Sequence, residues 1–224
     1  MGFKSSIADP DIWMRPNTKP DGEEYHEYIV CYVDDVLRIS MEARQIMQEI
    51  QKDFRFKKDK IEPPKMYLGV LLEKKKLNGR KVWTMNSKDC IKLAIANVEG
   101  QLRKRGLRLP TKVTTPMNST FSPELDISEE LDGEDITFYQ EIIGMLRWAI
   151  EIGRVDINFE ISLLSSYQAA PRTGHLEQLL HILAFLKKKP KLTIYFDPSE
   201  AIIDKSMFKQ DASEQLKDHY SHAE

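Results

Sequence analysis

Residues 28–39 of the chain read Tyr-Ile-Val-Cys-Tyr-Val-Asp-Asp-Val-Leu-Arg-Ile. Two runs of β-branched and aromatic residues, 28–33 and 36–39, are separated only by Asp34 and Asp35. Runs of this composition favour β-strands, and a two-residue spacing is typical of a tight antiparallel hairpin. We therefore expect a hairpin that carries two carboxylates at its tip.

The paired aspartates have two interpretations. One is an ordinary exposed turn, because water can screen the repulsion between the two charges. The other is a metal site, since apolar strands on both sides give a rigid support that presents carboxylate oxygens to a hard cation. Magnesium prefers such donors, and pairs of these ions about 3.5–4 Å apart catalyse nucleotidyl transfer. The apolar flanks favour the metal site.

A second hairpin is predicted downstream. Asn78-Gly79 is a strong hairpin signal, and it joins an apolar run at 66–72 to another at 81–85. Helices are predicted on either side of this hairpin, because apolar residues recur every three or four positions in residues 40–54 and 87–102.

The second half of the chain is predicted to be mostly helical. Residues 107–134 contain three prolines and many polar residues without periodicity, so they indicate an extended linker and a domain boundary. Helical patterns then cover 136–152, 155–167 and 174–188, and their short connections favour an antiparallel bundle. A last strand is expected at 191–196. The expected fold class is therefore α+β.

Charge is unevenly spread along the chain. The 224 residues include 33 basic and 35 acidic side chains, so the formal charge is 33 − 35 = −2. Residues 52–112 nevertheless carry 18 Lys/Arg against 6 Asp/Glu, and residues 119–162 carry 2 against 11. The basic block suits contact with a nucleic-acid backbone, because neutralised phosphates release counterions; a solvated face is the alternative. Trp83 lies within this basic block and could stack on a nucleic-acid base, although its inward position in the predicted hairpin favours a place in the hydrophobic core. The densest clusters are Lys74-Lys75-Lys76, Arg80-Lys81 and Arg103-Lys104-Arg105.

Composition excludes several classes of protein. With 41% hydrophobic residues the chain suits a folded globular protein, and no apolar run reaches the ~18 residues of a membrane-spanning helix. The N-terminal residues lack the apolar stretch of a secretory signal. Cys31 and Cys90 alone cannot form a disulfide framework or a four-ligand zinc site. We therefore expect an intracellular protein with reduced thiols.

Several short motifs, taken in order, resemble segments of the reverse transcriptases of copia-type LTR retrotransposons. Tyr32-Val33-Asp34-Asp35 resembles the Tyr-x-Asp-Asp box of that family, and Tyr67-Leu68-Gly69-Val70 resembles its Tyr/Phe-Leu-Gly primer-grip motif. Gly153-Arg154-Val155 departs from the family's usual Thr-Arg-Pro. The match covers about residues 1–200, and the order of its motifs makes it specific. The other similar segments are residues 2–6, 9–13, 115–116, 139–146 and 154–157, and Pro171 with His175.

The resemblance implies a role for each matched residue. Asp34-Asp35 would be the catalytic carboxylates of a palm domain and would hold Mg²⁺ or Mn²⁺, with Tyr32-Val33 bordering the primer end. Tyr67-Leu68-Gly69 would lie against the primer backbone, where glycine permits a close approach. The basic clusters would then contact the backbone of the template-primer duplex.

The resemblance also implies an activity, partners and a domain organisation. The activity is RNA-directed DNA synthesis from dNTPs on an RNA/DNA template-primer duplex. The partners include the rest of a Gag-Pol polyprotein and no membrane, and the location is cytoplasmic, in retrotransposon particles, or nuclear. The expected regions are a partial palm with both hairpins (1–86), a thumb-like helix (87–106), a linker (107–134), a helical connection region ending in a strand (135–197) and a poorly ordered tail (198–224).

The family carries a further catalytic aspartate and its fingers upstream of the first matched segment, and residues 195–198 lack its RNase H pattern. We therefore expect a fragment that does not extend primers in isolation. One alternative is a non-catalytic nucleic-acid- or protein-binding remnant of such an element. Another is a degenerate reading frame without a stable fold.

Overall fold

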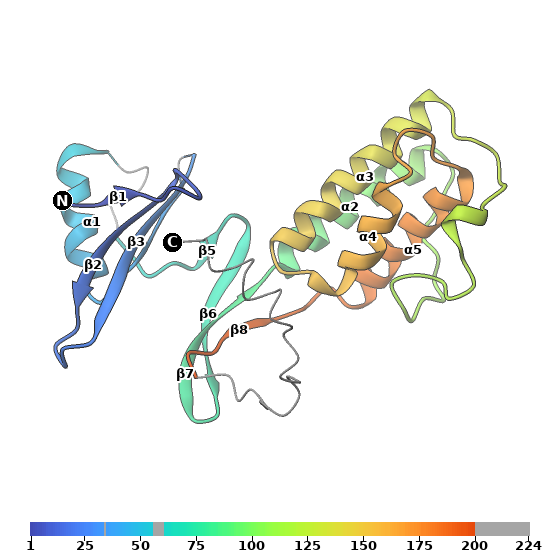
Figure 1. The fold of residues 1–224 in the computed structure, drawn as a ribbon. Coiled ribbons are helices and arrows are strands. Elements are labelled where there is room, and N and C mark those ends of the chain that lie inside the picture. Colours follow the sequence, from blue (N-terminus) through green and yellow to red (C-terminus); the bar gives the residue numbers. More distant parts are fainter. Residues whose placement is uncertain (34, 56–60, 200–224) are drawn as a thin grey trace, which may run out of the picture.

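The computed structural model describes residues 1–33, 35–55 and 61–199. Figure 1 shows three parts: a first sheet with one helix, a second sheet, and a bundle of helices. Antiparallel sheets and packed helices together confirm the expected α+β class. Asp34 lies outside the described residues, as does the predicted tail from residue 200 onward.

The first sheet has the strand order β1-β2-β3-β4. Its strands β3 and β4 form the predicted aspartate hairpin, with Tyr32 opposite Asp35. Strands β1 and β2 were not expected from the sequence, because Pro16 interrupts the apolar pattern. The two-residue β1 pairs with residues 13 and 14 of β2, so no described strand covers this edge of β2 at Pro16, where a missing N–H is tolerated. The bounds are β1 Lys4–Ser5, β2 Ile12–Thr18, β3 Glu24–Tyr32 and β4 Asp35–Ile39, followed by helix α1 Ala43–Asp53.

The second sheet has the order β5-β6-β7-β8. Its predicted hairpin is confirmed, since Asn78 and Gly79 both have positive φ (48° and 81°), as a type I′ turn requires. The prediction of one strand over 66–72 was wrong. This segment folds as a second two-residue hairpin, because Leu68 and Gly69 also adopt positive φ (51° and 78°). The bounds are β5 Met66–Tyr67, β6 Val70–Leu77, β7 Arg80–Asn86 and β8 Ile194–Phe196.

The bundle contains the main hydrophobic core. Helices α2 (Lys88–Lys104), α3 (Gly133–Glu151), α4 (Asn158–Ser165) and α5 (Thr173–Lys188) all contribute fully buried aliphatic residues to one cluster. The three predicted helices of the second half are therefore confirmed. The second of them begins as a short 3₁₀ turn, Val155–Ile157, before α4. Another 3₁₀ turn is formed by Pro123–Leu125.

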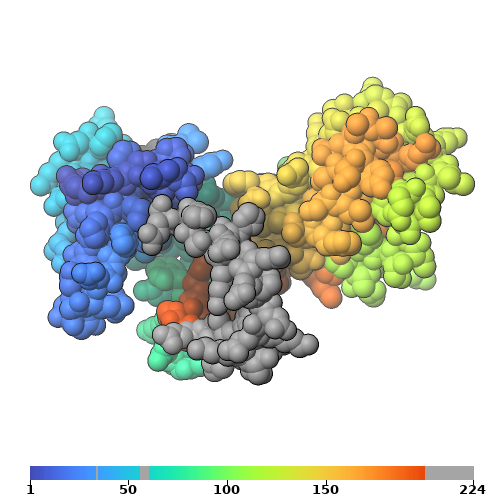
Figure 2. Space-filling view, in the orientation of Figure 1, coloured from blue at the N-terminus to red at the C-terminus, as the bar shows by residue number. Residues whose placement is uncertain are grey.

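Residues 107–134 lie against the bundle. Figure 2 shows this segment, in lime, beside the orange helices. Side chains of α5 bind its backbone: His181 Nε2 lies 3.1 Å from the Thr115 carbonyl, and Lys188 Nζ donates to the Val113 carbonyl at 3.1 Å. Val113 is 3% exposed and belongs to the core cluster. The segment for which the sequence indicates a linker is therefore fixed to α5 at several points.

Candidate functional site

The turn between β3 and β4 combines a strained residue with an exposed carboxylate. Val33 has φ +54°, a left-handed conformation that β-branched residues rarely adopt. Its side chain is 93% exposed, and the side chain of Asp35 is also exposed. Strained turns of this kind concentrate at functional sites, because the surrounding structure must hold them in place. Of the predicted metal pair, only Asp35 belongs to the described residues.

A buried ionic cluster holds the base of this hairpin. Glu27 of β3 is fully buried, and it accepts hydrogen bonds from Arg15 Nε at 2.6 Å and from the hydroxyl of Ser40. Arg38 Nη2, on β4, lies 3.4 Å from the same carboxylate. Burial by itself raises the pKa of Glu27, but the hydrogen bonds from Ser40 and Arg15 outweigh it and lower the pKa to about 2. The cluster therefore joins β2, β3 and β4 through one ionised carboxylate.

Phe3 completes this cluster. The guanidinium carbons of Arg15 and Arg38 lie 4.6 and 4.8 Å from the centre of its ring. Phe3 belongs to residues 2–6, one of the segments that resemble the retrotransposon family. Sequence reasoning missed the cluster, although Arg38 gives a partial signal, because it is a charged residue inside the apolar run at 36–39.

Tyr67 links the two predicted motifs electrostatically. Its hydroxyl oxygen is buried and has no hydrogen-bond partner within residues 1–33, 35–55 and 61–199. Burial raises the pKa of Tyr67, and Asp35 and Cys31 of the aspartate hairpin raise it further. The pKa of Tyr67 therefore responds to charge on the aspartate hairpin, although Asp35 and Tyr67 are 67 − 35 = 32 positions apart.

The Leu68-Gly69 turn also contacts the bundle. A Cβ atom at Gly69 would lie 3.8 Å from Cys90 Sγ, near the start of α2. The turn thus packs against the first helix of the bundle. Burial raises the pKa of Cys90, so its thiol stays protonated and acts as a packing group at neutral pH.

The predicted basic clusters are separated in space. The lysine triplet of β6 and the Arg80-Lys81 pair of β7 lie along one hairpin of the second sheet, whereas Arg103-Lys104-Arg105 lies at the far end of α2 (Figure 1). Arg105 forms an ion pair with Asp135, and its guanidinium lies 4.5 Å from the Phe138 ring, so it holds α2 to α3. Trp83, for which the sequence favours the core, is only partly buried beneath the ammonium of Lys74.

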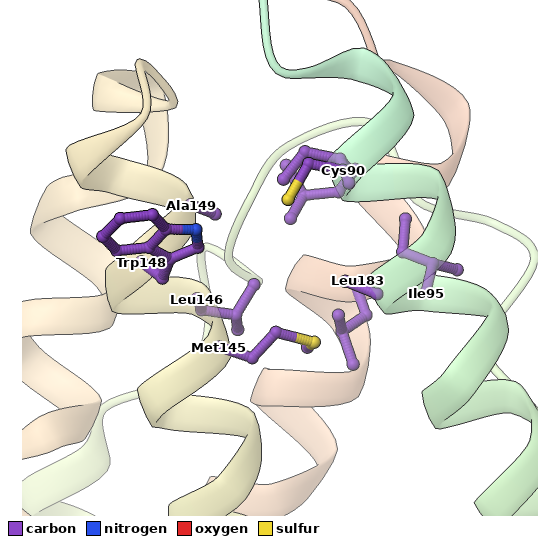
Figure 3. Close-up of a pocket in the computed structure, with 10 residues that line it drawn as sticks. Cys90, Ile95, Met145, Leu146, Trp148, Ala149 and Leu183 are labelled. Carbon is purple, nitrogen blue, oxygen red and sulfur yellow. The ribbon is translucent and has the colours of Figure 1, made fainter. Parts of the chain in front are cut away.

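A small cavity in the bundle is not a candidate active site. Figure 3 shows it between α2, α3 and α5, with Cys90, Met145 and Trp148 among its lining residues. Its volume of about 30 Å³ suits one water molecule, and its walls are almost entirely apolar. Within the described ranges, no three His, Cys, Asp or Glu residues form a metal-binding group. None of the described helices is both long and apolar enough to cross a membrane.

The downstream motif residues stabilise the bundle. Arg154 is 1% exposed; its Nε and Nη2 each donate to the Asp156 carboxylate at 2.8 Å, and its Nη1 donates to the Lys189 carbonyl at 2.8 Å. His175 accepts from the Arg172 N–H at 3.0 Å, and its other ring nitrogen lies 3.0 Å from the Pro123 carbonyl. These contacts join the ends of α5 to α3 and to residues 107–134. They lie in the bundle, away from the aspartate hairpin.

The chain is similar to a protein of Saccharomyces cerevisiae that carries the name "Putative transposon Ty5-1 protein", with 30% identity over 192 residues. The similarity covers 79% of this chain and 58% of the yeast protein, so the chain spans less than two thirds of that relative's length. No protein-family model matches the chain. No solved structure matches it either.

Proposed function

We propose that this chain supplies part of the palm of an RNA-directed DNA polymerase from a copia-type LTR retrotransposon. The observation that carries the proposal is the electrostatic link between Asp35 of the aspartate hairpin and Tyr67 of the Tyr67-Leu68-Gly69 turn, where the charge of Asp35 helps to raise the pKa of Tyr67. A polymerase needs such a link, because the end of the primer must be held beside the metal-binding carboxylates. Similarity to a yeast transposon protein supports a retrotransposon origin.

The donor groups of the hairpin fit a magnesium or manganese ion. Asp35 is exposed and presents carboxylate oxygens, which these hard cations prefer, together with waters and substrate phosphates. With Asp34 it would hold the ion, which would neutralise the charge that develops on the transferred phosphate. On the side away from β3, no described strand pairs with β4. We propose that a strand carrying the family's further aspartate pairs along this edge.

The primer end would lie between the two turns. Tyr32 and Val33 are 47% and 93% exposed on the aspartate hairpin, so both side chains are available to a nucleotide. Gly69 is exposed at the tip of the Leu68-Gly69 turn, where a sugar-phosphate backbone can approach closely. The remaining partners that we propose are the template strand, dNTPs and the rest of a Gag-Pol polyprotein.

Photochemical cross-linking tests this proposal without requiring activity. A DNA primer with a photoreactive 3′-terminal nucleotide is annealed to an RNA template, irradiated with the full chain, and the attached peptides are identified by mass spectrometry. We expect attachment to peptides that contain Tyr32-Val33 and Tyr67-Leu68-Gly69. A primer with the same nucleotide at its 5′ end is the control, because that end lies away from the metal-binding carboxylates.

Two outcomes contradict the palm assignment. If the duplex does not bind, or if 3′-end attachment occurs only outside the two turns, the turns do not hold a primer. Attachment restricted to residues 74–81 would instead support the alternative of a non-catalytic nucleic-acid-binding remnant.

A further inference from the structure

The second sheet separates its charges by face. Directly paired residues in an antiparallel sheet share a face, and the register pairs Lys74 with Trp83, Trp83 with Phe196, and Lys76 with Lys81. Lys74, Lys76, Lys81, Trp83 and Phe196 therefore lie on one side, which we name the basic face. Among the described residues of the sheet, no carboxylate belongs to this face.

The opposite face carries carboxylates as well as cations. Lys75 Nζ lies 3.1 Å from Glu73 Oε2. Hydrogen bonds from Ser199 and, more weakly, the charge of Arg80 lower the pKa of Asp197, which follows β8. The two faces belong to the same hairpin but carry different net charges. The difference in net charge between the two faces therefore does not follow from the local sequence composition, which both faces share.

The basic face has features that an anionic ligand would stabilise. Lys76 and Lys81 are both exposed and directly opposite each other, and like charges in this arrangement destabilise a strand pair. The ammonium of Lys74 lies 4.7 Å from the centre of the Trp83 ring. Phe196 lies beside Trp83 and is 50% exposed. Phosphates would relieve the lysine repulsion, and the exposed phenyl ring offers a flat apolar surface.

Cationic and aromatic groups together distinguish single strands from duplexes. Bases in a duplex are stacked inside the helix, whereas those of a single strand can stack on an aromatic side chain. We propose that the basic face binds single-stranded nucleic acid, with phosphates at Lys76 and Lys81 and a base stacked on Phe196 beside Trp83. Lys76 follows Val70 by six residues, so this site lies about 20 Å along β6 from the Leu68-Gly69 turn.

A direct test measures the anisotropy of a fluorescent oligothymidylate of about 12 nucleotides, titrated with the full chain at low salt. Lys76→Ala/Lys81→Ala removes two cations from the basic face, and Lys75→Ala/Arg80→Ala removes two from the opposite face. Each single-strand phosphate contact contributes about 0.7 to the salt slope, so the first variant should lose about 25-fold in affinity at 0.1 M salt. The second variant, with the same change in net charge, should lose less than about 2-fold because both of its cations lie on the opposite face and Lys75 already pairs with Glu73.

A second pair of variants tests stacking. Phe196→Leu should weaken binding by about 5-fold or more, because stacking on one aromatic ring contributes about 1–3 kcal/mol per base. Tyr195→Leu is the matched control, since Tyr195 is the adjacent residue, similarly exposed, on the opposite face. Unchanged far-ultraviolet circular dichroism and an unchanged urea unfolding midpoint show that each variant is folded.

Three results would overturn the proposal: no binding of the oligonucleotide, equal losses for the two double-alanine variants, or equal losses for the two leucine variants. Equally tight binding of a duplex of the same length would also overturn it, because it leaves no role for stacking. The assay contains neither primer nor Mg²⁺. Its failure is therefore distinguishable from a failure of the palm assignment, which depends on cross-links at the two turns.

Discussion

Replacing Glu27 by glutamine should destabilise the first sheet by a predictable amount. The pKa of Glu27 lies at about 2 in the folded chain and near 4.5 when the carboxyl is solvated. Each pKa unit corresponds to about 1.4 kcal/mol, so the ionised carboxylate contributes about 3 kcal/mol at pH 7. Because the folded pKa is the lower one, this stability is complete above about pH 4.5 and is lost as the pH falls toward 2. At pH 3 the contribution of the ionised carboxylate to stability should have decreased to about 1 kcal/mol.

The distribution of tryptophans makes the measurement local. Trp13 lies in β2, Trp83 in β7 and Trp148 in α3, so each part of the molecule contains one of the three tryptophans. In a Trp83→Phe/Trp148→Phe background, Trp13 fluorescence reports urea unfolding of the first sheet. We expect Glu27→Gln to lower the free energy of unfolding by about 3 kcal/mol at pH 7, with the difference from the parent shrinking at pH 3.

Glu23→Gln provides the control. Glu23 pairs with Lys19 at 2.5 Å, but its side chain is 63% exposed, so this substitution should change stability by less than about 1 kcal/mol. The reasoning is refuted if Glu27→Gln behaves like the control. It is also refuted if the difference between Glu27→Gln and the parent stays constant from pH 7 to pH 3.

Other expectations follow from the same structure. The chain alone should not extend an RNA-templated primer with Mg²⁺, because two-metal chemistry needs a further carboxylate from another strand. The Asp35→Asn variant should therefore behave like the parent in a primer-extension assay, and clear extension by the parent would contradict this expectation. Arg154→Met should destabilise the bundle by about 2–3 kcal/mol, because the charged hydrogen bonds of Arg154 are lost. Urea unfolding followed through Trp148 fluorescence measures this change, and an unchanged unfolding midpoint would argue against a stabilising role for Arg154. Val33→Asn should stabilise the first sheet by about 1 kcal/mol, followed through Trp13, because asparagine tolerates positive φ.

Turn chemistry decided how well the sheets could be predicted. Asn78-Gly79 marks a type I′ turn directly, because both residues tolerate positive φ, and the hairpin was found where expected. Leu68-Gly69 forms the same type of turn, but leucine rarely adopts positive φ, so the segment resembles one continuous strand. Pro16 concealed β2 in a similar way. Its strand pattern becomes clear only once pairing with β3 is known.

Contacts between distant side chains decided what could be predicted of the site. The sequence identified Asp35 and Tyr67 as parts of separate motifs, but local patterns contain no signal for the electrostatic link between them. Residues 107–134 lack periodicity because side chains of α5, such as His181 and Lys188, determine their path. The sequence around Phe196 carries no signal for binding, since its place beside Trp83 arises only when β8 pairs with β7.

The pairing of β8 with β7 has a consequence for synthesis of the chain. Residues 87–193 lie between these two strands, so the complete bundle is translated before β8 can join the sheet. At about 5–20 residues per second, β7 waits about 5–20 s after leaving the ribosome for its second partner. During that interval its hydrogen-bonding edge is open to other strands. Early folding of the bundle would shorten the distance that β8 must search, because the bundle brings its own two ends to the same sheet.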